Sequence, residues 1–351
     1  MLAGYPLGLD FSVMDPARDA CAGPLGRHVA ADWDDEEALE FLACATECIT
    51  YEFENVPDEV VRKLNQQSPV LPPPHALTAG RDRLLEKTLF NQLEIETAPF
   101  VAVENEEDLR AGVEQLGYPC VLKTRTLGYD GKGQVVLQGD EDPAEAWRAI
   151  GRVPAILEGF VDFDREVSLI SVRGREGELA FYPLTENRHH QGILRLSRNL
   201  AEDPLQGRAE VYARRMLERL DYVGVLAIEF FQTGERLLAN EMAPRVHNSG
   251  HWTIEGAVTS QFENHLRAIV GLPLGDTSAL GHAAMVNLIG TVPDVRRLLQ
   301  VPGAHLHLYG KAPRPGRKLG HLTLLEKDER LLNAKLAHLR EWFPELEEAF
   351  S

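Results

Sequence analysis

Two glutamates interrupt apolar segments that lie close together along the chain. Glu229 stands in LAIEFF and Glu241 in LLANEMA, runs that are otherwise typical of a protein core. Each acid taken separately would usually be salt-bridged. If the segments form a hairpin, a three-residue loop at 234–236 would place their β-carbons about 5 Å apart on one face, whereas a two-residue loop would put them on opposite faces. Carboxylates that close need a proton or a cation between them, and hard oxygen ligands favour Mg²⁺.

A dense group of polar residues, NEMAPRVHNSGHW, contains Glu241 and continues beyond it as a loop. Arg245 offers a fork for a carboxylate or phosphate, and Asn248 and Ser249 offer neutral donors. Nothing in this stretch resembles a nucleophile elbow. A zinc site at His247 and His251 is disfavoured, because the Asn-Ser-Gly between them breaks a helix. The loop therefore suits an anionic substrate.

The stretch LGYDGKGQ at 127–134 combines three glycines with a lysine. Its backbone N–H groups can approach anionic oxygens closely, as phosphate-binding loops do. It is not a Walker A motif, and it lies between two predicted strands, so a plain hairpin loop is the alternative. Lys123 ends the apolar strand CVLK and needs an anionic partner, which favours the phosphate-binding interpretation.

Two further segments leave alternatives open. Glu158 and Glu166 flank GFVDFDR, which would present backbone groups to an adenine edge and a carboxylate to a ribose, or would serve as a plain crossover between domains. The basic segment KAPRPGRKLGH at 311–321 is either a solvated loop or the local positive charge that a phosphorylated substrate requires.

The elements that must position these groups alternate between strands and helices. The proline cluster at 68–74 predicts a linker, and helix 79–93 after it has apolar residues at 84, 85, 89 and 93. The other predicted helices cover 35–46, 105–117, 142–151, about 207–220 and 328–341. The predicted strands cover 9–16, 118–125, 155–160, 165–174, 178–187, the hairpin 224–242, 283–290 and 304–310. Residues 48–57 are predicted to be a strand that runs into a loop.

Composition narrows the class of protein. A chain of 351 residues with 44% apolar residues predicts two or three globular domains. Its 36 basic and 54 acidic residues give a net charge of −18, which disfavours nucleic acid and anionic membranes as partners. No run approaches the ~20 apolar residues of a membrane span, and the N-terminus lacks a signal-peptide pattern, so a cytoplasmic location is expected. Four cysteines form no CxxC pair, and Cys44 and Cys48 are expected to be buried thiols rather than metal ligands.

The ordered set of motifs resembles the ATP-grasp ligases. The set is RDRLLEK, VLKTRTLGYDGKGQ, EGFVDFDREVSL, ENRHHQGILRLS, AIEFFQTGERLLANEMAPRVHNSGHWT, MVNLIG and GRKLGH. Within that superfamily GYDGKGQ, NEMAPRVHNSGHW and RKLGH look specifically like the 5-(carboxyamino)imidazole ribonucleotide synthases of purine biosynthesis. The match covers nearly the whole chain, and the APRVHNSGH block carries most of its specificity.

The resemblance implies a mixed α/β and α+β fold in three parts. They are a Rossmann-like preATP-grasp domain at 1–75, an ATP-grasp domain at 76–280 with lobes at about 95–160 and 161–280, and a small β-rich C-terminal domain at 281–351 with a final helix. The family normally opens with a strand and a turn of the type GGGQLGRM, and this chain begins just beyond that turn. The resemblance therefore implies a first domain truncated at its N-terminus, from a start site assigned too late or in a weakened enzyme.

The resemblance also implies the reaction and the roles of particular residues. ATP, bicarbonate and 5-aminoimidazole ribonucleotide would give the N-carboxylated ribonucleotide, ADP and phosphate, by way of carboxyphosphate and with Mg²⁺. A homodimer is the expected assembly. The residues carried over for ATP are Arg83, Lys123, Gly128, Tyr129, Asp130, Gly131, Lys132, Gly133, Gln134, Glu158, Gly159, Phe160, Val161, Glu166, His189, Asn240 and Glu241. Those for the ribonucleotide and its carboxylating agent are Tyr129, Asp130, Arg245, His247, Asn248, Ser249, Lys311, Arg317 and Lys318. Glu229 and Glu241 would bind Mg²⁺.

The catalytic roles fall to Lys123, Asp130 and Arg245. Lys123 would neutralise charge on the transferring phosphoryl group, Arg245 would hold the carboxyphosphate or substrate anion, and Asp130 would accept the amine proton. Two alternatives stay open: another ATP-grasp ligase or carboxylase acting on a phosphoribosyl substrate, and a nucleotide-binding protein with impaired catalysis.

Overall fold

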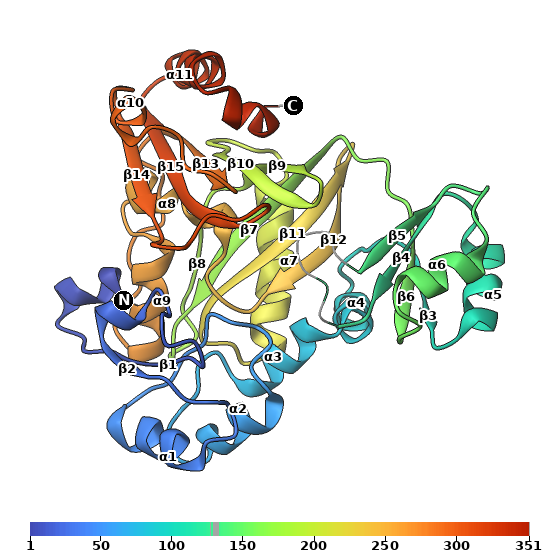
Figure 1. The fold of residues 1–351 in the computed structure, drawn as a ribbon, viewed down its shortest axis with the longest axis horizontal. Coiled ribbons are helices and arrows are strands. Elements are labelled where there is room, and N and C mark those ends of the chain that lie inside the picture. The colour runs from blue at the N-terminus through green and yellow to red at the C-terminus, as the bar shows by residue number, and fades with distance from the viewer. Residues whose placement is uncertain (127, 129–132, 351) are drawn as a thin grey trace.

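A large twisted sheet runs through the middle of the molecule (Figure 1). The fold is that of a computed structural model, which describes residues 1–126, 128 and 133–350. The strands of this sheet are β7 (Arg165–Arg173), β8 (Leu179–Phe181), β9 (Thr185–His190), β10 (Ile193–Asn199), β11 (Gly224–Thr233), β12 (Arg236–Ala243), β13 (His282–Ile289), β14 (Ala304–Leu308) and β15 (Lys318–Glu326). Their order is β12-β11-β7-β9-β10-β13-β15-β14, with β8 paired to β7. The predicted strand 178–187 is thus divided into β8 and the start of β9.

The sheet is buried on both faces, which explains the continuous apolar run of β11. Leu226, Ile228 and Phe230 point into one core with α7 (Gln206–Arg219), while Val225 and Ala227 point into another with α9 (Gln261–Val270). This alternation follows from the two-residue period of a strand. Two short helices precede α9, namely η3 (Asn248–Gly250) and α8 (Thr253–Gly256).

The C-terminal strands continue this sheet. Leu196 of β10 is paired with Val286 of β13, so the hydrogen-bonded ladder passes from the central strands into the C-terminal ones. The helices after β13 are α10 (Val295–Leu298), α11 (Glu329–Trp342) and η4 (Pro344–Ala349). Leu332, Leu336 and Leu339 of α11 pack in the apolar core of this end of the sheet.

A smaller four-stranded antiparallel sheet stands to one side of the large one (Figure 1). Its strands are β3 (Phe100–Val103), β4 (Cys120–Thr124), β5 (Gln134–Leu137) and β6 (Ala155–Gly159), in the order β3-β6-β4-β5. Helices α5 (Glu106–Leu116) and α6 (Pro143–Ala149) share its core, and the Asn105 and Asp142 side chains cap their N-termini. The glycine-rich stretch connects β4 to β5.

The N-terminal segment contains η1 (Leu2–Leu7), η2 (Gly23–Leu25) and the parallel pair β1 (Ser12–Met14) and β2 (Arg27–Val29). Helices α1 (Glu36–Ala45), α2 (Asp58–Asn65) and α3 (Pro74–Arg81) follow. The strand predicted to begin at residue 48 and to run into a loop by residue 57 is reduced to Ile49, which pairs with Val70 in an isolated bridge. Cys44 is exposed because α1 buries its opposite face, so the expectation of two buried thiols is wrong.

The predicted helix 79–93 is two helices. Asp82 separates α3 from α4 (Arg83–Gln92), because its carboxylate accepts hydrogen bonds from the Leu84 and Leu85 N–H groups and caps α4. The buried side of α4 includes Glu86 and Lys87, while Leu85 is 47% exposed. No helix among the described residues is long and apolar enough to cross a lipid bilayer.

Neighbouring phenylalanines on β11 provide a test of this packing. Phe230 is fully buried, and we expect Phe230→Ala to lower the free energy of unfolding by about 3–5 kcal/mol. Phe231 points the other way and stacks on Phe163 with ring centroids 4.8 Å apart, so Phe231→Ala should cost about 1 kcal/mol. Urea unfolding measures both, and equal losses would contradict the assigned strand register.

Candidate active site

Glu229 and Glu241 face each other across the β11–β12 hairpin. The turn has two residues, because Thr233 pairs with Arg236, and a regular ladder from that turn would put the two acids on opposite faces. A β-bulge intervenes: Phe230 pairs with Ala239 but Glu229 pairs with Glu241, leaving Asn240 as the extra residue. The shorter turn is therefore the one present, and the bulge still brings the carboxylates together.

The two carboxyl groups have opposite pKa shifts. Burial alone would raise the pKa of Glu229, but a hydrogen bond from His247 and cationic groups around it, including Lys318, lower it to about 2. Desolvation by the surrounding protein and the charge of Glu229 raise the pKa of Glu241, although the residue itself is exposed to solvent. The charges of Arg83 and Lys123 partly oppose this shift. Within the pair, Glu229 is therefore readily ionised, whereas ionisation of Glu241 is disfavoured.

These residues fit Mg²⁺. Two facing carboxylates, one of them with a raised pKa, provide hard oxygen ligands, which match this ion. Among the described residues no cluster of three or more His, Cys, Asp or Glu side chains has metal-binding geometry. Magnesium commonly binds through one or two carboxylates together with phosphate oxygens and water, so a pair is sufficient.

Basic groups from the small lobe and from the helix before it lie beside this pair. The charges of Arg83 and Lys123 act on Glu241, although the three residues come from α4, β4 and β12. Arg83 donates to the Thr124 carbonyl oxygen over 2.9 Å, and a β-carbon at Gly128 would collide with its guanidinium. A side chain at position 128 would therefore displace the Arg83 guanidinium from this position.

The glycine-rich stretch is only partly described. Gly133 has a positive φ of 71°, and its carbonyl oxygen accepts from the Thr124 N–H. Gln134 begins β5 opposite Lys123 and is exposed. The predicted roles of Tyr129, Asp130, Gly131 and Lys132 lie outside the described residues.

Lys123 finds its anionic partner in Glu158. One Glu158 carboxylate oxygen lies 3.0 Å from Lys123 Nζ and 3.4 Å from Lys87 Nζ. Lys87 and Glu158 are almost fully buried, and the other carboxylate oxygen of Glu158 is buried without a hydrogen-bond partner. Such an oxygen is expected to find an N–H donor, which a bound ligand would supply.

Sequence reasoning missed Glu86 and Lys87. Glu86 accepts from the Met242 N–H over 2.6 Å, and Lys87 donates to the Ala239 carbonyl oxygen over 3.2 Å. Burial and the charge of Glu241 raise the pKa of Glu86 well above its usual value. The available signal was two charged residues at the positions that precede the buried Leu89 and Phe90 in the helical repeat.

The segment between the two lobes begins at Glu158. The Gly159 N–H donates to the Pro99 carbonyl oxygen over 2.8 Å, and the Phe160 N–H to that of Pro119 over 3.2 Å. The Phe160 side chain is 48% exposed and Val161 is half-buried. The segment thus already uses these two N–H groups within the protein.

Glu166 and His189 form a pair on neighbouring strands. His189 Nδ1 is hydrogen-bonded to a Glu166 carboxylate oxygen. Burial alone would lower the pKa of His189, but this hydrogen bond and the charge of Glu229 raise it. The pair therefore lies close enough to the central carboxylates to respond to them.

The loop after β12 connects the carboxylates to the rest of the molecule. Arg245 is ion-paired with Glu54 of the N-terminal segment at 2.9 Å, and His247 Nε2 lies 3.1 Å from Glu229. Asn248 exchanges two amide hydrogen bonds with Asn287 of β13, at 3.1 and 2.7 Å. The three parts of the chain thus meet at this loop.

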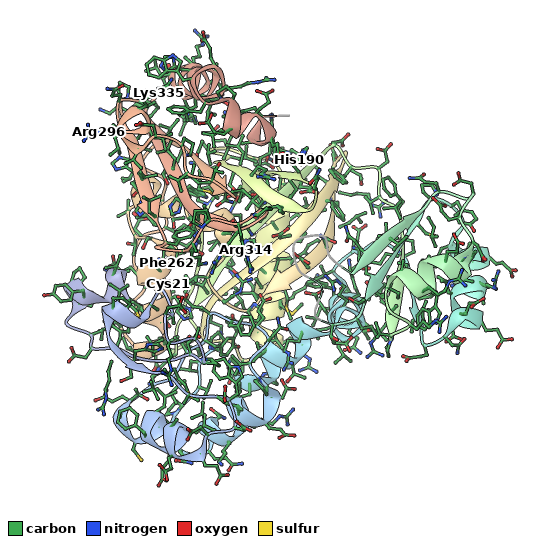
Figure 2. All side chains as sticks on the ribbon, in the orientation of Figure 1. Cys21, His190, Phe262, Arg296, Arg314 and Lys335 are labelled. Carbon is green, nitrogen blue, oxygen red and sulfur yellow. The ribbon has the colours of Figure 1, made fainter. Side chains whose placement is uncertain are left out.

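The basic segment reaches the same region. Lys318, the first residue of β15, acts electrostatically on Glu229. Lys311 Nζ lies 5.4 Å from the centre of the Tyr309 ring, and Arg317 donates to the Ala312 carbonyl oxygen over 3.2 Å. Arg314, in the same loop, is exposed and is seen near the middle of the view in Figure 2.

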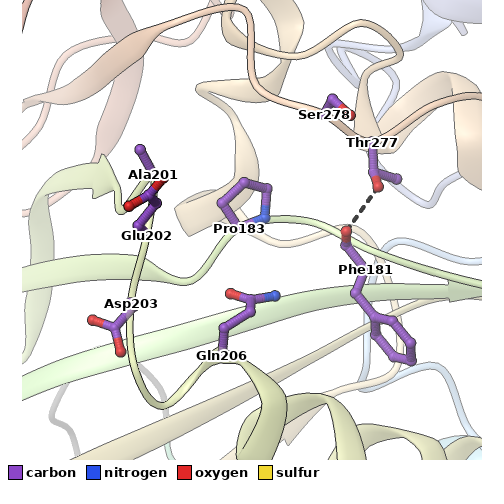
Figure 3. Close-up of a pocket in the computed structure, with 8 residues that line it drawn as sticks. All are labelled: Phe181, Pro183, Ala201, Glu202, Asp203, Gln206, Thr277 and Ser278. Carbon is purple, nitrogen blue, oxygen red and sulfur yellow. Dashed lines mark hydrogen bonds between the residues drawn. The ribbon is translucent and has the colours of Figure 1, made fainter.

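A separate hollow of about 300 Å³ lies where β8, the start of α7 and the 277–278 loop meet (Figure 3). Its charged lining residues, Glu202 and Asp203, are acidic, and Asp203 is committed to an ion pair with Arg165. It therefore does not suit phosphate groups. The residues that line it are Phe181, Pro183, Ala201, Glu202, Asp203, Gln206, Thr277 and Ser278.

Two lobes facing a carboxylate pair, with basic groups from the smaller lobe, define the ATP-grasp class. The ATP-grasp domain family matches residues 88–262. A ribonucleotide synthetase preATP-grasp domain matches residues 1–80, and the C-terminal domain of phosphoribosylaminoimidazole carboxylase matches residues 283–335.

The relatives define the particular family. The chain is 54% identical to the N5-carboxyaminoimidazole ribonucleotide synthase of Pseudomonas aeruginosa, covering 96% of this chain and 94% of that protein. The Brucella melitensis enzyme of the same name is 47% identical, covering 93% and 92%. The chain belongs to the N5-carboxyaminoimidazole ribonucleotide synthase family. This family is the same as the 5-(carboxyamino)imidazole ribonucleotide synthases that the motifs resemble.

Solved structures agree with this fold. The crystal structure of N5-carboxyaminoimidazole ribonucleotide synthetase from Thermus thermophilus superposes with a TM-score of 0.92 at 56% identity, covering 97% of this chain and 94% of that chain. The Aspergillus clavatus synthase in complex with ADP and 5-aminoimidazole ribonucleotide gives 0.89 at 27% identity, covering 99% and 94%. The expected α/β and α+β architecture is therefore confirmed.

The opposite pKa shifts predict opposite effects on stability at pH 7.5 without metal. The lowered pKa of Glu229 means that its ionised form stabilises the fold above its usual pKa of 4.5, and this contribution is lost as the pH falls toward 2. The raised pKa of Glu241 means that its ionisation destabilises the fold as the pH rises through the folded value. Glu229→Gln should lower the thermal midpoint by on the order of 2 °C. Glu241→Gln should raise it by less, because solvent screens the charge of the exposed Glu241. Shifts of the same sign would contradict this electrostatic account.

Proposed function

We propose that this chain carboxylates 5-aminoimidazole ribonucleotide with bicarbonate, using ATP, to give 5-(carboxyamino)imidazole ribonucleotide, ADP and phosphate in purine biosynthesis. One observation carries the proposal. His247 joins Glu229 to the loop at 245–249, so a carboxylate pair suited to a metal-bound phosphate lies directly beside a loop suited to an anionic acceptor. Family membership supplies the identity of the two substrates.

The nucleotide would lie between the two sheets. The unpartnered oxygen of Glu158 is a buried acceptor for the exocyclic amino group of adenine, and Glu166 is an acceptor for ribose hydroxyls. Arg83, Lys123 and the described residues Gly128, Gly133 and Gln134 would surround the phosphates. Lys123 pairs with Glu158 in the free protein. When ATP binds, Lys123 would interact with a phosphate group as well.

The first step is transfer of the γ-phosphoryl group to bicarbonate. A bicarbonate oxygen attacks phosphorus, the bond to the β-phosphate oxygen breaks, and ADP leaves with its electron pair. Lys123 and Arg83 would stabilise the charge that develops on the transferring group. Mg²⁺ bound by Glu229 and Glu241 would supply further positive charge there, with Asn240 beside them.

The second step consumes carboxyphosphate. The bond between the carboxyl carbon and the phosphate oxygen breaks, and carboxyphosphate separates into CO₂ and phosphate, which keeps the electron pair. The exocyclic amine then attacks the CO₂ carbon to form the new C–N bond and loses a proton. Arg245 would hold the anion, with His247, Asn248 and Ser249 around the acceptor. The role of Asp130 as proton acceptor stays a prediction. Lys311, Arg317 and Lys318 would bind the substrate phosphate.

Three of the predictions made from the sequence and the family resemblance remain predictions. They are assembly as a homodimer, a cytoplasmic location, and a division into domains at about residues 75 and 280. The pairing of β10 with β13 bears on the second boundary, because it joins the C-terminal strands to the grasp domain through one sheet. These strands would therefore move with the large lobe.

Substrate dependence tests the proposed reaction. Phosphate release from ATP should require both bicarbonate and 5-aminoimidazole ribonucleotide, and labelled bicarbonate should appear in the ribonucleotide product. Formate should not replace bicarbonate. Stimulation by formate with a different ribonucleotide would indicate another ATP-grasp ligase, and ATP binding without stimulated hydrolysis would indicate a catalytically impaired protein.

Two arginines near the hairpin separate the proposed acceptor site from general effects. Arg245→Ala removes the fork that would hold the carboxyphosphate, so bicarbonate-dependent ADP release should fall about 100-fold. Arg236→Ala is the control, since Arg236 lies at the exposed turn and pairs with Glu96. Unchanged ADP release and product yield in Arg245→Ala would rule out the assigned role of Arg245.

A further inference from the structure

A chain of buried polar side chains leads away from the active site into the large sheet. Ser249 and Ser168 have hydroxyl oxygens 2.7 Å apart, and Asn187 donates to Ser168 over 2.9 Å. Ser197 in turn donates to the Asn187 side-chain oxygen over 2.9 Å. These residues come from η3, β7, β9 and β10, and all four are buried.

This chain of hydrogen-bonded side chains ends at the imidazole of His247. The Ser249 hydroxyl lies 2.8 Å from His247 Nδ1, and the Ser249 N–H donates to the same nitrogen over 3.3 Å. A backbone N–H can only donate, so Nδ1 must be an acceptor. The remaining ring proton is then on Nε2, which lies 3.1 Å from the Glu229 carboxylate.

That single backbone donor sets the direction of every other bond in the chain. Ser249 donates its hydroxyl proton to Nδ1 and so must accept from Ser168, which accepts from the Asn187 amide. The Asn187 oxygen is then free to accept from Ser197. With any one bond reversed, two donors or two acceptors would face each other.

A buried hydrogen-bonded chain of this kind adds little net stability to a sheet. Replacing both partners of a buried hydrogen bond with apolar groups of similar shape is nearly neutral or stabilising. Apolar residues occupy neighbouring buried positions on the same strands, such as Val167 and Leu169. A fully satisfied buried network does, however, fix a single arrangement of its side chains, and here that arrangement includes the His247 ring.

We propose that Ser168 and Asn187 are positioning residues that hold His247 with Nε2–H directed at Glu229. They act through Ser249 and orient the imidazole that joins the metal-binding carboxylates to the acceptor loop. The catalytic consequence rests on the proposed function, whereas the orientation of His247 does not. In this arrangement the chain keeps Glu229 aligned for the phosphoryl transfer step.

A matched pair of serines on β7 tests the proposal. Ser168→Ala removes the link to His247, while Ser171→Ala removes an equally buried hydroxyl that donates to the Leu226 carbonyl oxygen over 2.9 Å. We expect Ser168→Ala to lower kcat for bicarbonate-dependent ADP release about 10-fold with little change in the KM for ATP. Ser171→Ala should change neither, and Ser168→Thr should restore most of kcat.

Nitrogen-15 NMR of histidine-labelled protein provides a readout that does not depend on activity. The His247 signals, assigned by their loss in His247→Gln, should show a protonated Nε2 and an unprotonated Nδ1. In Ser168→Ala they should move toward a mixture of tautomers, and in Ser171→Ala they should not.

Three results would overturn the proposal: a protonated Nδ1 in the unaltered protein, equal losses in both alanine variants, or a Ser168→Ala variant with unchanged spectrum and rate. Absence of carboxylated product from the unaltered protein, together with the expected His247 spectrum, would refute the proposed function alone.

Discussion

Repulsion between two carboxylates is the constraint on which the rest of this structure depends. Glu229 and Glu241 are cross-strand neighbours, and the other residues of β11 and β12 near them are largely apolar. Like charges placed directly opposite each other destabilise a strand pair, so the arrangement persists only if other groups compensate. The surrounding histidines, lysines and arginine serve that purpose in the free protein, and a metal ion with phosphate would serve it in the working enzyme.

The compensating groups come from every part of the chain, and this explains the architecture. Arg83 and Lys123 belong to the small lobe and the helix before it, His189 and His247 to the large sheet and its loop, and Lys318 to the C-terminal strands. Glu54 of the N-terminal segment holds Arg245. An active site built in this way responds to the relative position of the lobes, which is what a ligase that must protect carboxyphosphate from water requires.

Some groups support the site without facing a ligand. Glu86 and Lys87 tie α4 to the backbone of β12, on either side of the bulge that aligns Glu241. The serine and asparagine chain does the same for His247 from the other side of the sheet. Both sets are buried and hydrogen-bonded, so they are rigid, and a rigid surrounding shell is what keeps catalytic groups in a productive geometry.

The sequence by itself determined the family and the fold class, and it pointed to Glu229, Glu241 and His247, which the fold brings together. It could do so because motifs such as APRVHNSGH and the interrupted apolar runs are local patterns. It left open whether Glu229 and Glu241 meet, since a β-bulge at Asn240 reverses the outcome that the two-residue turn alone would give. It predicted the wrong buried side of α4. Helical periodicity favours burial of Leu85 over burial of Glu86, whereas the burial of Glu86 and Lys87 depends on their partners in β12 and β6. Only tertiary structure decided these points, since strand register and buried ion pairs are set by contacts between residues far apart in the chain.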